Sequence, residues 1–262
     1  MTTMSIDNLK SIKASGNKFA AITAYDYSFA TLIDRAEIEV TLVGDSLGNV
    51  IQGQETTIPV SVDEMAYHTA NVKRGIQSSL VLSDMPFMSY ATVPQAMDNA
   101  AILMQAGAQM VKLEGGEWLT ETVYALTQRG IPVCGHLGLT PQSVHKLGGF
   151  KVQGKQASAA DKMLSEAKML EDAGADLLVV ECVPSLLGKT LATALKIPVI
   201  GIGAGPDTDA QVLVLQDMLG ISSRLPKFAK NYLQQSSSIQ DALSAYRSEV
   251  IRGAFPTLEH GF

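Results

Sequence analysis

Short apolar runs alternate along the chain with longer segments in which apolar residues recur at helical spacing. The short runs are rich in valine, isoleucine and leucine, and glycine, proline, serine or aspartate stands at their ends. This alternation is typical of βαβ units built around a parallel sheet. It predicts eight strands, within residues 19–25, 40–44, 79–83, 109–113, 131–136, 176–180, 197–203 and 211–216.

The segments between these strands carry recognisable helix boundaries. Ser61 with Glu64, and Thr92 with Gln95, have the spacing of a capping box, in which two side chains satisfy free N–H groups at a helix start. The stretches "QAGAQMVKLE" and "EDAGADLLVVE" repeat one unit, which is a helix end, a glycine, a buried strand and a terminal acid. Repetition of this kind is expected of a barrel.

The number of elements predicts the fold class. Eight strands and about as many helices in 262 residues predict an α/β protein, a single (β/α)₈ TIM-barrel domain over residues 1–262 with an N-terminal helical extension. An open doubly wound sheet is the alternative. The one dinucleotide-like string, "GIGAGP", places Pro206 where the fingerprint needs its third glycine, so it predicts a tight turn instead.

Acidic residues stand at the ends of four predicted strands: Asp45, Asp84, Glu114 and Glu181, with His136 at the end of a fifth. In a barrel the carboxyl ends of the strands converge on one face, where active sites lie. Any one of these acids could be a helix N-cap or a solvated turn residue. Four acids together repel one another and are unfavourable unless a cation joins them, so the pattern predicts a bound metal ion.

The available ligand types indicate a hard metal ion. The four histidines have no zinc-like pair spacing, so nitrogen and sulfur ligands are poorly supplied. Carboxylate oxygens, completed by water and substrate, suit Mg²⁺ or a similar divalent ion.

A lysine lies on the same side of its strand as one of the acids. Side chains alternate across a strand, so Lys112 is expected one layer below Glu114 inside the barrel. Its ammonium would pair with an acid, hold an anionic substrate or form a Schiff base. His136 would bind substrate or be a core histidine, and Ser46, beside Asp45, would hold a substrate carboxylate or serve the turn.

These residues together favour chemistry on an α-keto acid. A metal held by carboxylates, with open coordination positions, can chelate such a substrate and stabilise an enolate while a nearby base removes the adjacent proton. Glu181 is the predicted base, because it lies on a different strand from the other acids.

Composition and charge exclude several classes of protein. With 46% hydrophobic and 18% charged residues, the chain has the composition of a soluble globular protein. Its net charge of −6, without any block of like charge, argues against nucleic acid as a partner. Cys134 and Cys182 predict reduced buried thiols and a cytoplasmic location. The chain has neither an apolar signal region nor a long apolar segment, so neither export nor membrane insertion is predicted.

One glycine- and lysine-rich stretch follows the fifth predicted strand. The string "HKLGGFKVQGKQ", residues 145–156, predicts a long loop over the mouth of the barrel. It would act either as a lid or as a plain surface loop.

Several strings closely resemble the ketopantoate hydroxymethyltransferase family. They are "AYD" (24–26), "LVGDSLG" (42–48), "SDMPF" (83–87), "VKLEGG" (111–116), "GHLGLTPQSVHKLGGFKVQG" (135–154) and "GIGAG" (201–205). The resemblance runs from about residue 5 to the terminal "EHGF". It implies a Mg²⁺-dependent barrel that moves a hydroxymethyl group from 5,10-methylenetetrahydrofolate to 3-methyl-2-oxobutanoate, giving 2-dehydropantoate.

The resemblance also implies roles for particular residues. Asp45 and Asp84 match aspartates that hold the metal, and Glu114 matches a further ligand that acts directly or through water. The residues matching substrate contacts are Ser46 and Lys112, and Glu181 matches the proton acceptor. The family is cytoplasmic and forms homo-oligomers, often decamers.

Two departures and three rival interpretations accompany the resemblance. Ala210 stands where glycine is expected and Gln216 where histidine is common, which affects local loop shape rather than the reaction. A Mg²⁺-dependent lyase or mutase of the isocitrate lyase and phosphonopyruvate mutase type is the closest rival, but the chain lacks its "KKCGH"-like string. A Schiff-base aldolase acting through Lys112 and an inactive scaffold are the others.

Overall fold

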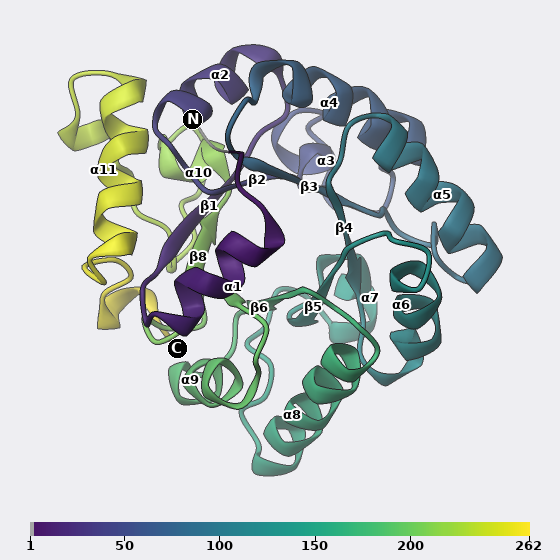
Figure 1. Ribbon diagram of the computed structural model, residues 1–262. Helices are drawn as coiled ribbons and strands as arrows, with labels where there is room; N and C mark the ends of the chain where they lie inside the picture. Colours follow the sequence, from purple (N-terminus) through teal and green to yellow (C-terminus); the bar gives the residue numbers. More distant parts are fainter. Residues whose placement is uncertain (1–2) are drawn as a thin grey trace.

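The computed structural model describes residues 3–262, in which eight parallel strands close into a barrel (Figure 1). Each strand pairs with the next along the chain, and the last pairs with the first. All eight overlap the predicted ranges, so the (β/α)₈ barrel is confirmed. The strands are β1 (Phe19–Thr23), β2 (Val40–Val43), β3 (Leu80–Asp84), β4 (Met110–Glu114), β5 (Val133–Gly138), β6 (Leu177–Glu181), β7 (Val199–Ile202) and β8 (Ala210–Leu213).

Helices form a ring outside the strands, and shorter helices lie in the loops (Figure 1). The longer ones are α1 (Ile6–Ala14), α2 (Tyr27–Arg35), α4 (Val62–Gly75), α5 (Val93–Gln105), α6 (Thr120–Thr127), α8 (Ala157–Asp172), α9 (Ser185–Ala194) and α11 (Ile239–Ile251). The single-turn ones are α3 (Leu47–Val50), α7 (Val144–Leu147), α10 (Leu215–Met218), and the 3₁₀ turns η1 (Glu117–Leu119), η2 (Pro141–Ser143), η3 (Leu233–Gln235) and η4 (Leu258–His260).

Alternation along each strand sorts side chains between two cores. On β4, Val111 and Leu113 point outward and join the large cluster beneath the helices. Met110 points inward and joins a second apolar cluster inside the barrel, which includes Leu82 and Cys134 from neighbouring strands. The inward positions near the carboxyl ends of the strands are therefore left for polar groups.

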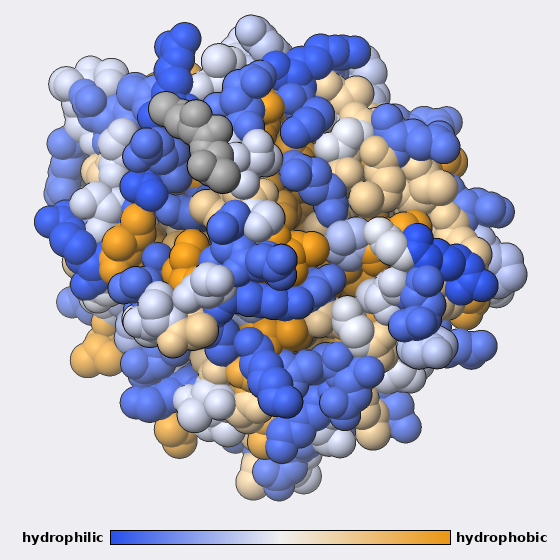
Figure 2. Space-filling model, in the orientation of Figure 1, coloured by the Kyte–Doolittle hydropathy of each residue, from blue (hydrophilic) through white to orange (hydrophobic). Residues whose placement is uncertain are grey.

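The N-terminal helix closes the end of the barrel where the strands begin. Leu9 of α1 is fully buried in the inner cluster, and Ile6 and Ile12 pack against it. Figure 1 shows α1 lying across this end, and Figure 2 shows the same face covered mostly by hydrophilic residues with small separate apolar groups. Among residues 3–262, the helices are all too short or too polar to cross a bilayer.

The predicted helix starts are confirmed in one case and corrected in part in the other. Ser61 and Glu64 form the full capping box at the start of α4. Thr92 caps α5 by accepting the N–H of Gln95, but the Gln95 side chain accepts the N–H of Ala91 rather than that of Thr92. The amide reaches one residue too far back to close the box, so only half of it forms.

Candidate active site

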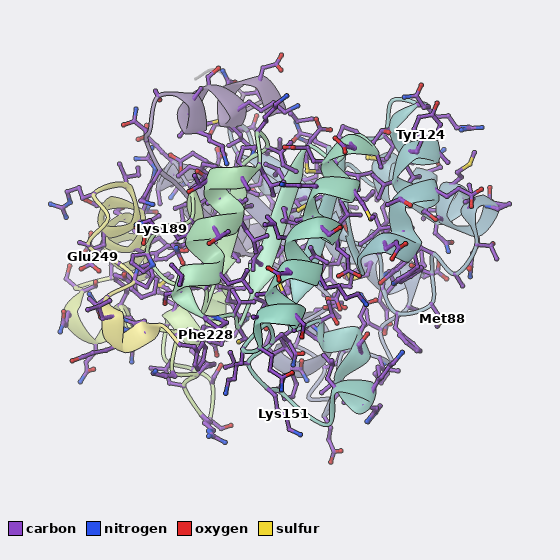
Figure 3. The ribbon with its side chains drawn as sticks, turned by 90° about the horizontal axis from the view of Figure 1, so that it is seen from below. Met88, Tyr124, Lys151, Lys189, Phe228 and Glu249 are labelled. Atoms are coloured by element: carbon purple, nitrogen blue, oxygen red, sulfur yellow. The ribbon has the colours of Figure 1, made fainter. Side chains whose placement is uncertain are left out.

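A cavity of about 1030 Å³ opens at the carboxyl ends of the strands. The loops that surround it lie at one end of the barrel, where Figure 3 shows Met88, Lys151 and Phe228 toward the lower side of the view. The structure places all seven site residues predicted from the sequence on the wall of this cavity: Asp45, Ser46, Asp84, Lys112, Glu114, His136 and Glu181.

Strand register brings the charged residues side by side. Asp84 of β3 pairs with Lys112 of β4, and Glu114 of β4 pairs with His136 of β5. Because neighbouring strands lie about 4.8 Å apart, side chains in register on the inner face are forced into contact. Glu181, at the end of β6, is in register with Gly138, where a Cβ would lie 2.2 Å from the Glu181 carbonyl oxygen, so the close approach of the two strands requires glycine.

Lys112 lies at the centre of this cluster and is 3% exposed. Its Nζ is 3.1 Å from Asp84 Oδ1, 3.6 Å from Glu114 Oε1 and 3.2 Å from His136 Nδ1. Burial alone would lower the pKa of this ammonium, but the surrounding carboxylates raise it above its ordinary value. Of the three roles expected for Lys112, pairing with acids is the one present in this structure.

Both carboxylate oxygens of Glu114 already have partners. Oε1 is 3.1 Å from His136 Nδ1, and Oε2 accepts the backbone N–H of Gln142 at 3.0 Å. Burial alone would raise the pKa of Glu114, but His136 and Lys112 lower it below its usual value. Glu114 is therefore an ionised structural centre of the cluster as well as a predicted metal ligand.

Asp45 and Asp84 are the two acids of the cluster whose ionised forms are disfavoured by burial. The backbone N–H of Asp45 donates to Asp84 Oδ2 at 3.0 Å, while Asp84 Oδ1 is buried without a hydrogen bond. The pKa of Asp45 is raised well above its usual value by burial and by the charges of Asp84 and Glu114. Burial also raises the pKa of Asp84, although Lys112 opposes this.

His136 connects the buried acids to the more open Glu181. Its Nδ1 faces Glu114, and its Nε2 is 3.4 Å from Glu181 Oε2 without forming a hydrogen bond. Burial and Lys112 lower the pKa of the imidazole, but Glu114 and Glu181 outweigh them and raise it to about 9. At neutral pH His136 is therefore an imidazolium between two carboxylates.

Sequence reasoning missed Gln142, which ties the cluster together. Its Nε2 donates to Asp45 Oδ2 at 2.8 Å and to the carbonyl of Met85 at 3.0 Å, while its Oε1 accepts the hydroxyl of Tyr90. Gln142 lies in η2, which follows β5, and it is 5% exposed. A glutamine in a polar loop gives no periodic signal, so only its place in the long resembling string could have marked it.

Two further rim residues have definite places. Ser46 Oγ is 2.8 Å from the hydroxyl of Tyr25, a buried residue whose carbonyl faces His68 Nδ1 at 2.6 Å. Asp26, the last residue of the "AYD" string, is the N-cap of α2 and accepts the N–H of Phe29. Asp26 therefore has the ordinary capping role.

The loop expected at residues 145–156 begins later, because residues 145–147 belong to α7, and its remainder contributes Phe150 to the cavity wall. Its Gln153 N–H donates to the carbonyl of Cys182 at 2.9 Å, which anchors the loop beside Glu181. Cys182 has a left-handed backbone, with φ of 47°. Both cysteines of the chain are buried and free, as predicted. The lid role of the loop stays a prediction.

The fit of a divalent ion can be judged from the oxygen atoms. Within residues 3–262, no group of three or more His, Cys, Asp or Glu side chains is preformed as a metal site. Asp84 Oδ1, which has Lys112 Nζ at 3.1 Å but no hydrogen bond, and the disfavoured charge of Asp45 nevertheless leave two adjacent carboxylates suited to a hard cation. The residues fit such an ion with these two carboxylates and with water or substrate as further ligands, whereas Glu114 is engaged elsewhere.

Comparisons with known proteins agree on one family. Residues 3–258 match the family model described as ketopantoate hydroxymethyltransferase. A protein of Shewanella sediminis named 3-methyl-2-oxobutanoate hydroxymethyltransferase is 59% identical, with 100% of both chains covered. A similar relative from Shewanella halifaxensis is 60% identical over the full length. Among solved structures, phosphoenolpyruvate phosphomutase from Streptomyces platensis matches with a TM-score of 0.63 at 13% identity, covering 97% of this chain and 92% of the other, which shows a shared fold alone.

Proposed function

The chain belongs to the ketopantoate hydroxymethyltransferase family, and on that premise we propose that it converts 3-methyl-2-oxobutanoate to 2-dehydropantoate. The hydroxymethyl carbon comes from 5,10-methylenetetrahydrofolate, and water supplies the hydroxyl group. A C–H bond at C3 of the keto acid is broken and a C–C bond to the methylene carbon is formed. Tetrahydrofolate leaves as the second product.

The observation that carries this proposal is the charge pattern of the site. From Glu181 through His136, Glu114 and Lys112 to Asp84, negative and positive groups alternate in contact. With Asp45 included, four carboxylates face two cations, which leaves two uncompensated negative charges when all are ionised. One divalent cation would balance them.

We assign that cation to Asp45 and Asp84, with Mg²⁺ as the expected ion. When bound there, it would supply a Lewis acid for the carboxylate and keto oxygens of the substrate. Glu114 remains a predicted ligand through water, because its own oxygens are occupied by His136 and the N–H of Gln142.

The remaining residues divide the work of binding and proton transfer. Lys112 contributes a fixed positive charge beside the keto acid, and Ser46 offers a hydroxyl already oriented by Tyr25. Glu181 accepts the C3 proton, since it is the carboxylate of the cluster with the most open side chain, 14% exposed. His136, whose Nε2 lies 3.4 Å from Glu181 Oε2, positions that carboxylate and contacts the substrate.

Two rival reactions remain distinguishable from this proposal. The lyase and mutase group shares the barrel, as the 2,3-dimethylmalate lyase structure at a TM-score of 0.59 and 15% identity shows, but family membership favours the transferase. A Schiff base through Lys112 is disfavoured because its ammonium is held protonated by neighbouring acids, and a neutral amine is required for attack.

We also propose the partners, the cellular location and the oligomeric state of the enzyme. Its partners are the keto acid and the folate, and the net charge of −6 gives no support for nucleic acid or membrane binding. We place it in the cytoplasm. Exposed Phe87, Met88, Trp118 and Tyr124 on neighbouring loops and helices are consistent with a homo-oligomer, a decamer by family resemblance.

One assay tests the proposal directly. Purified protein is incubated with 3-methyl-2-oxobutanoate and 5,10-methylenetetrahydrofolate, and 2-dehydropantoate is measured with Mg²⁺ and with EDTA. We expect product only with the metal. Product formation that is indifferent to EDTA, together with borohydride trapping of the keto acid on Lys112, would favour the Schiff-base mechanism instead.

A further inference from the structure

A second polar wall faces the same cavity from the opposite side of the barrel. It is formed by α10, which follows β8, and it contributes Gln216 and Asp217 to the lining. In the closed barrel, β8 is four strands away from β4 in either direction, so this wall lies across from Lys112 and Glu114. None of the roles assigned above uses these two residues.

The backbone of α10 is held rigidly in place. The N–H of Leu215 donates to Thr23 Oγ1 at the end of β1, at 2.9 Å. At the other end of the helix, the carbonyl of Met218 accepts the N–H of Tyr232 at 2.8 Å. Anchors at both ends fix where the side chains between them point, which is what a specific binding wall requires.

The two side chains are buried, and Gln216 Oε1 has no hydrogen-bond partner. Gln216 is 9% exposed, and its Oε1 is buried without a hydrogen bond. Asp217 is 8% exposed and forms no ion pair within the described part of the chain. Burial raises the pKa of Asp217, although a hydrogen bond with Ser222 opposes this. A buried amide oxygen without a partner is unfavourable, and so is a buried acid without an ion pair, so their presence together on a cavity wall points to a ligand.

The size of the cavity also calls for a second ligand. About 1030 Å³ is at the upper end of the range for drug-sized ligands, and a small keto acid at the acidic cluster would fill only a small part of it. Leu213, Val214 and Phe228 line the same cavity as Asp217 and offer apolar contact for a flat ring. Phe228 lies at the same end of the barrel in Figure 3.

We propose that Asp217 and Gln216 bind the pyrimidine edge of the folate pterin ring. That edge presents two adjacent donors, the N3–H and the 2-amino group, which match the two oxygens of one carboxylate. The amide of Gln216 is placed to pair with a further polar atom of the same ring. This inference rests on the proposed function, because that function supplies the folate, and it deepens it by naming the residues that select a pterin.

The test separates folate recognition from chemistry on the keto acid. Tetrahydrofolate and its 2-desamino analogue are titrated against wild type and Asp217→Asn by calorimetry. We expect wild type to bind the analogue about 10- to 100-fold more weakly than tetrahydrofolate, the effect of losing one hydrogen bond to a charged group. Asp217→Asn should bind tetrahydrofolate more weakly than wild type does, by a similar factor. The variant should bind tetrahydrofolate and the 2-desamino analogue with equal affinity.

Exchange of the C3 proton of the keto acid in D₂O provides the independent readout. Asp217→Asn should exchange at the wild-type rate, because the acidic cluster is untouched. Asp207→Asn is the matched control, since Asp207 is an exposed acid in the loop before β8 that pairs with Lys189 and does not line the cavity. It should change neither folate binding nor exchange.

Each outcome has a definite meaning. Equal binding of both ligands by wild type, or unchanged discrimination in Asp217→Asn, overturns the inference whether or not the enzyme is active. If Asp217→Asn does not fold, Gln216→Met replaces it, and unchanged tetrahydrofolate affinity in that variant counts against the assignment. Failure of wild type to exchange the C3 proton would instead overturn the proposed function.

Discussion

The central lysine offers the sharpest test of how the site is held together. Lys112→Met removes the ammonium that contacts Asp84 and Glu114 while keeping a long unbranched side chain. Asp45, Asp84 and Glu114 then face one another with His136 as the remaining positive neighbour among residues 3–262. We expect the metal-free protein to be strongly destabilised.

The magnitude follows from the observed distances. At 3.1 and 3.6 Å, the attractions of Lys112 to Asp84 and Glu114 are each about 5 kcal/mol at an effective dielectric constant of about 20. Desolvation of the ammonium, worth several kcal/mol, is regained in the variant and offsets part of this loss. The net cost should be about 3–5 kcal/mol, the usual result of removing one partner from a buried pair.

The sign of the pH dependence is fixed by the carboxylates. Without Lys112, the pKa values of Asp45 and Asp84 rise further above their unfolded values, so the native state binds more protons than the unfolded state. The contribution of Asp45 and Asp84 to stability is fully present below their unfolded pKa values, and it is lost as pH rises through their folded pKa values. The deficit of the variant should therefore be larger at pH 8 than at pH 5.

Urea unfolding followed by circular dichroism measures the deficit, in EDTA and with Mg²⁺. Mg²⁺ should stabilise the variant more than wild type, because the ion then meets more uncompensated negative charge. Lys10→Met is the matched control, since Lys10 forms a half-exposed pair with Asp176 and should cost less than about 1 kcal/mol. A deficit in EDTA no larger than that of the control, and independent of pH, would refute the reasoning.

Three further predictions concern separate parts of the molecule. Glu181→Gln should slow C3 proton exchange by a factor of about 10² or more while keto-acid binding, measured by calorimetry with Mg²⁺, stays within about threefold. Asp34→Asn should lower the free energy of unfolding by about 2 kcal/mol at pH 7, as measured by urea unfolding. The reason is that three hydrogen bonds from Ser78 and its neighbour outweigh burial and lower the Asp34 pKa. That stability is present above the unfolded pKa and lost as pH falls through the folded one, so the difference from wild type should begin to shrink near pH 4, about the unfolded pKa, and vanish only below the folded pKa. Gly188→Ala should lower the melting temperature, because the new Cβ would lie 2.1 Å from the carbonyl oxygen of Ala204. Helix propensity alone predicts the opposite, a gain in stability of about 1 kcal/mol, and such a gain would contradict this contact.

The fold could be predicted from the chain because burial imposes a regular pattern. Parallel strands that are covered on both faces appear as short apolar runs, and all eight runs became strands of the barrel. The half-formed box at Thr92 shows the limit of such local patterns. Spacing brings a donor and an acceptor into the same turn, but the reach of the Gln95 amide decides which N–H it meets.

The site could be predicted only in part, for a physical reason. Strand ends and the alternation of side chains placed Lys112 and Glu114 on one face, but the partner of each depends on register, which no single strand encodes. Gln142 was invisible because it acts through a loop that returns across the barrel to Asp45. Both Glu114 oxygens already have partners, which argues against direct metal ligation. One of these partners, the backbone N–H of Gln142, comes from that same loop.

The position of the charges along the strands argues that they are present for function rather than for stability. Lower in the barrel, the inward positions of β3 and β4 hold Leu82 and Met110, which pack in a dry apolar layer. Two residues further along the same strands, Asp84 and Lys112 take their place. An apolar side chain of similar volume is usually at least as stable as a buried ion pair, so this layer gains nothing in folding from its charges. A barrel that fills one layer with hydrocarbon could fill the next in the same way, and a charged layer at its mouth is what the proposed reaction would require.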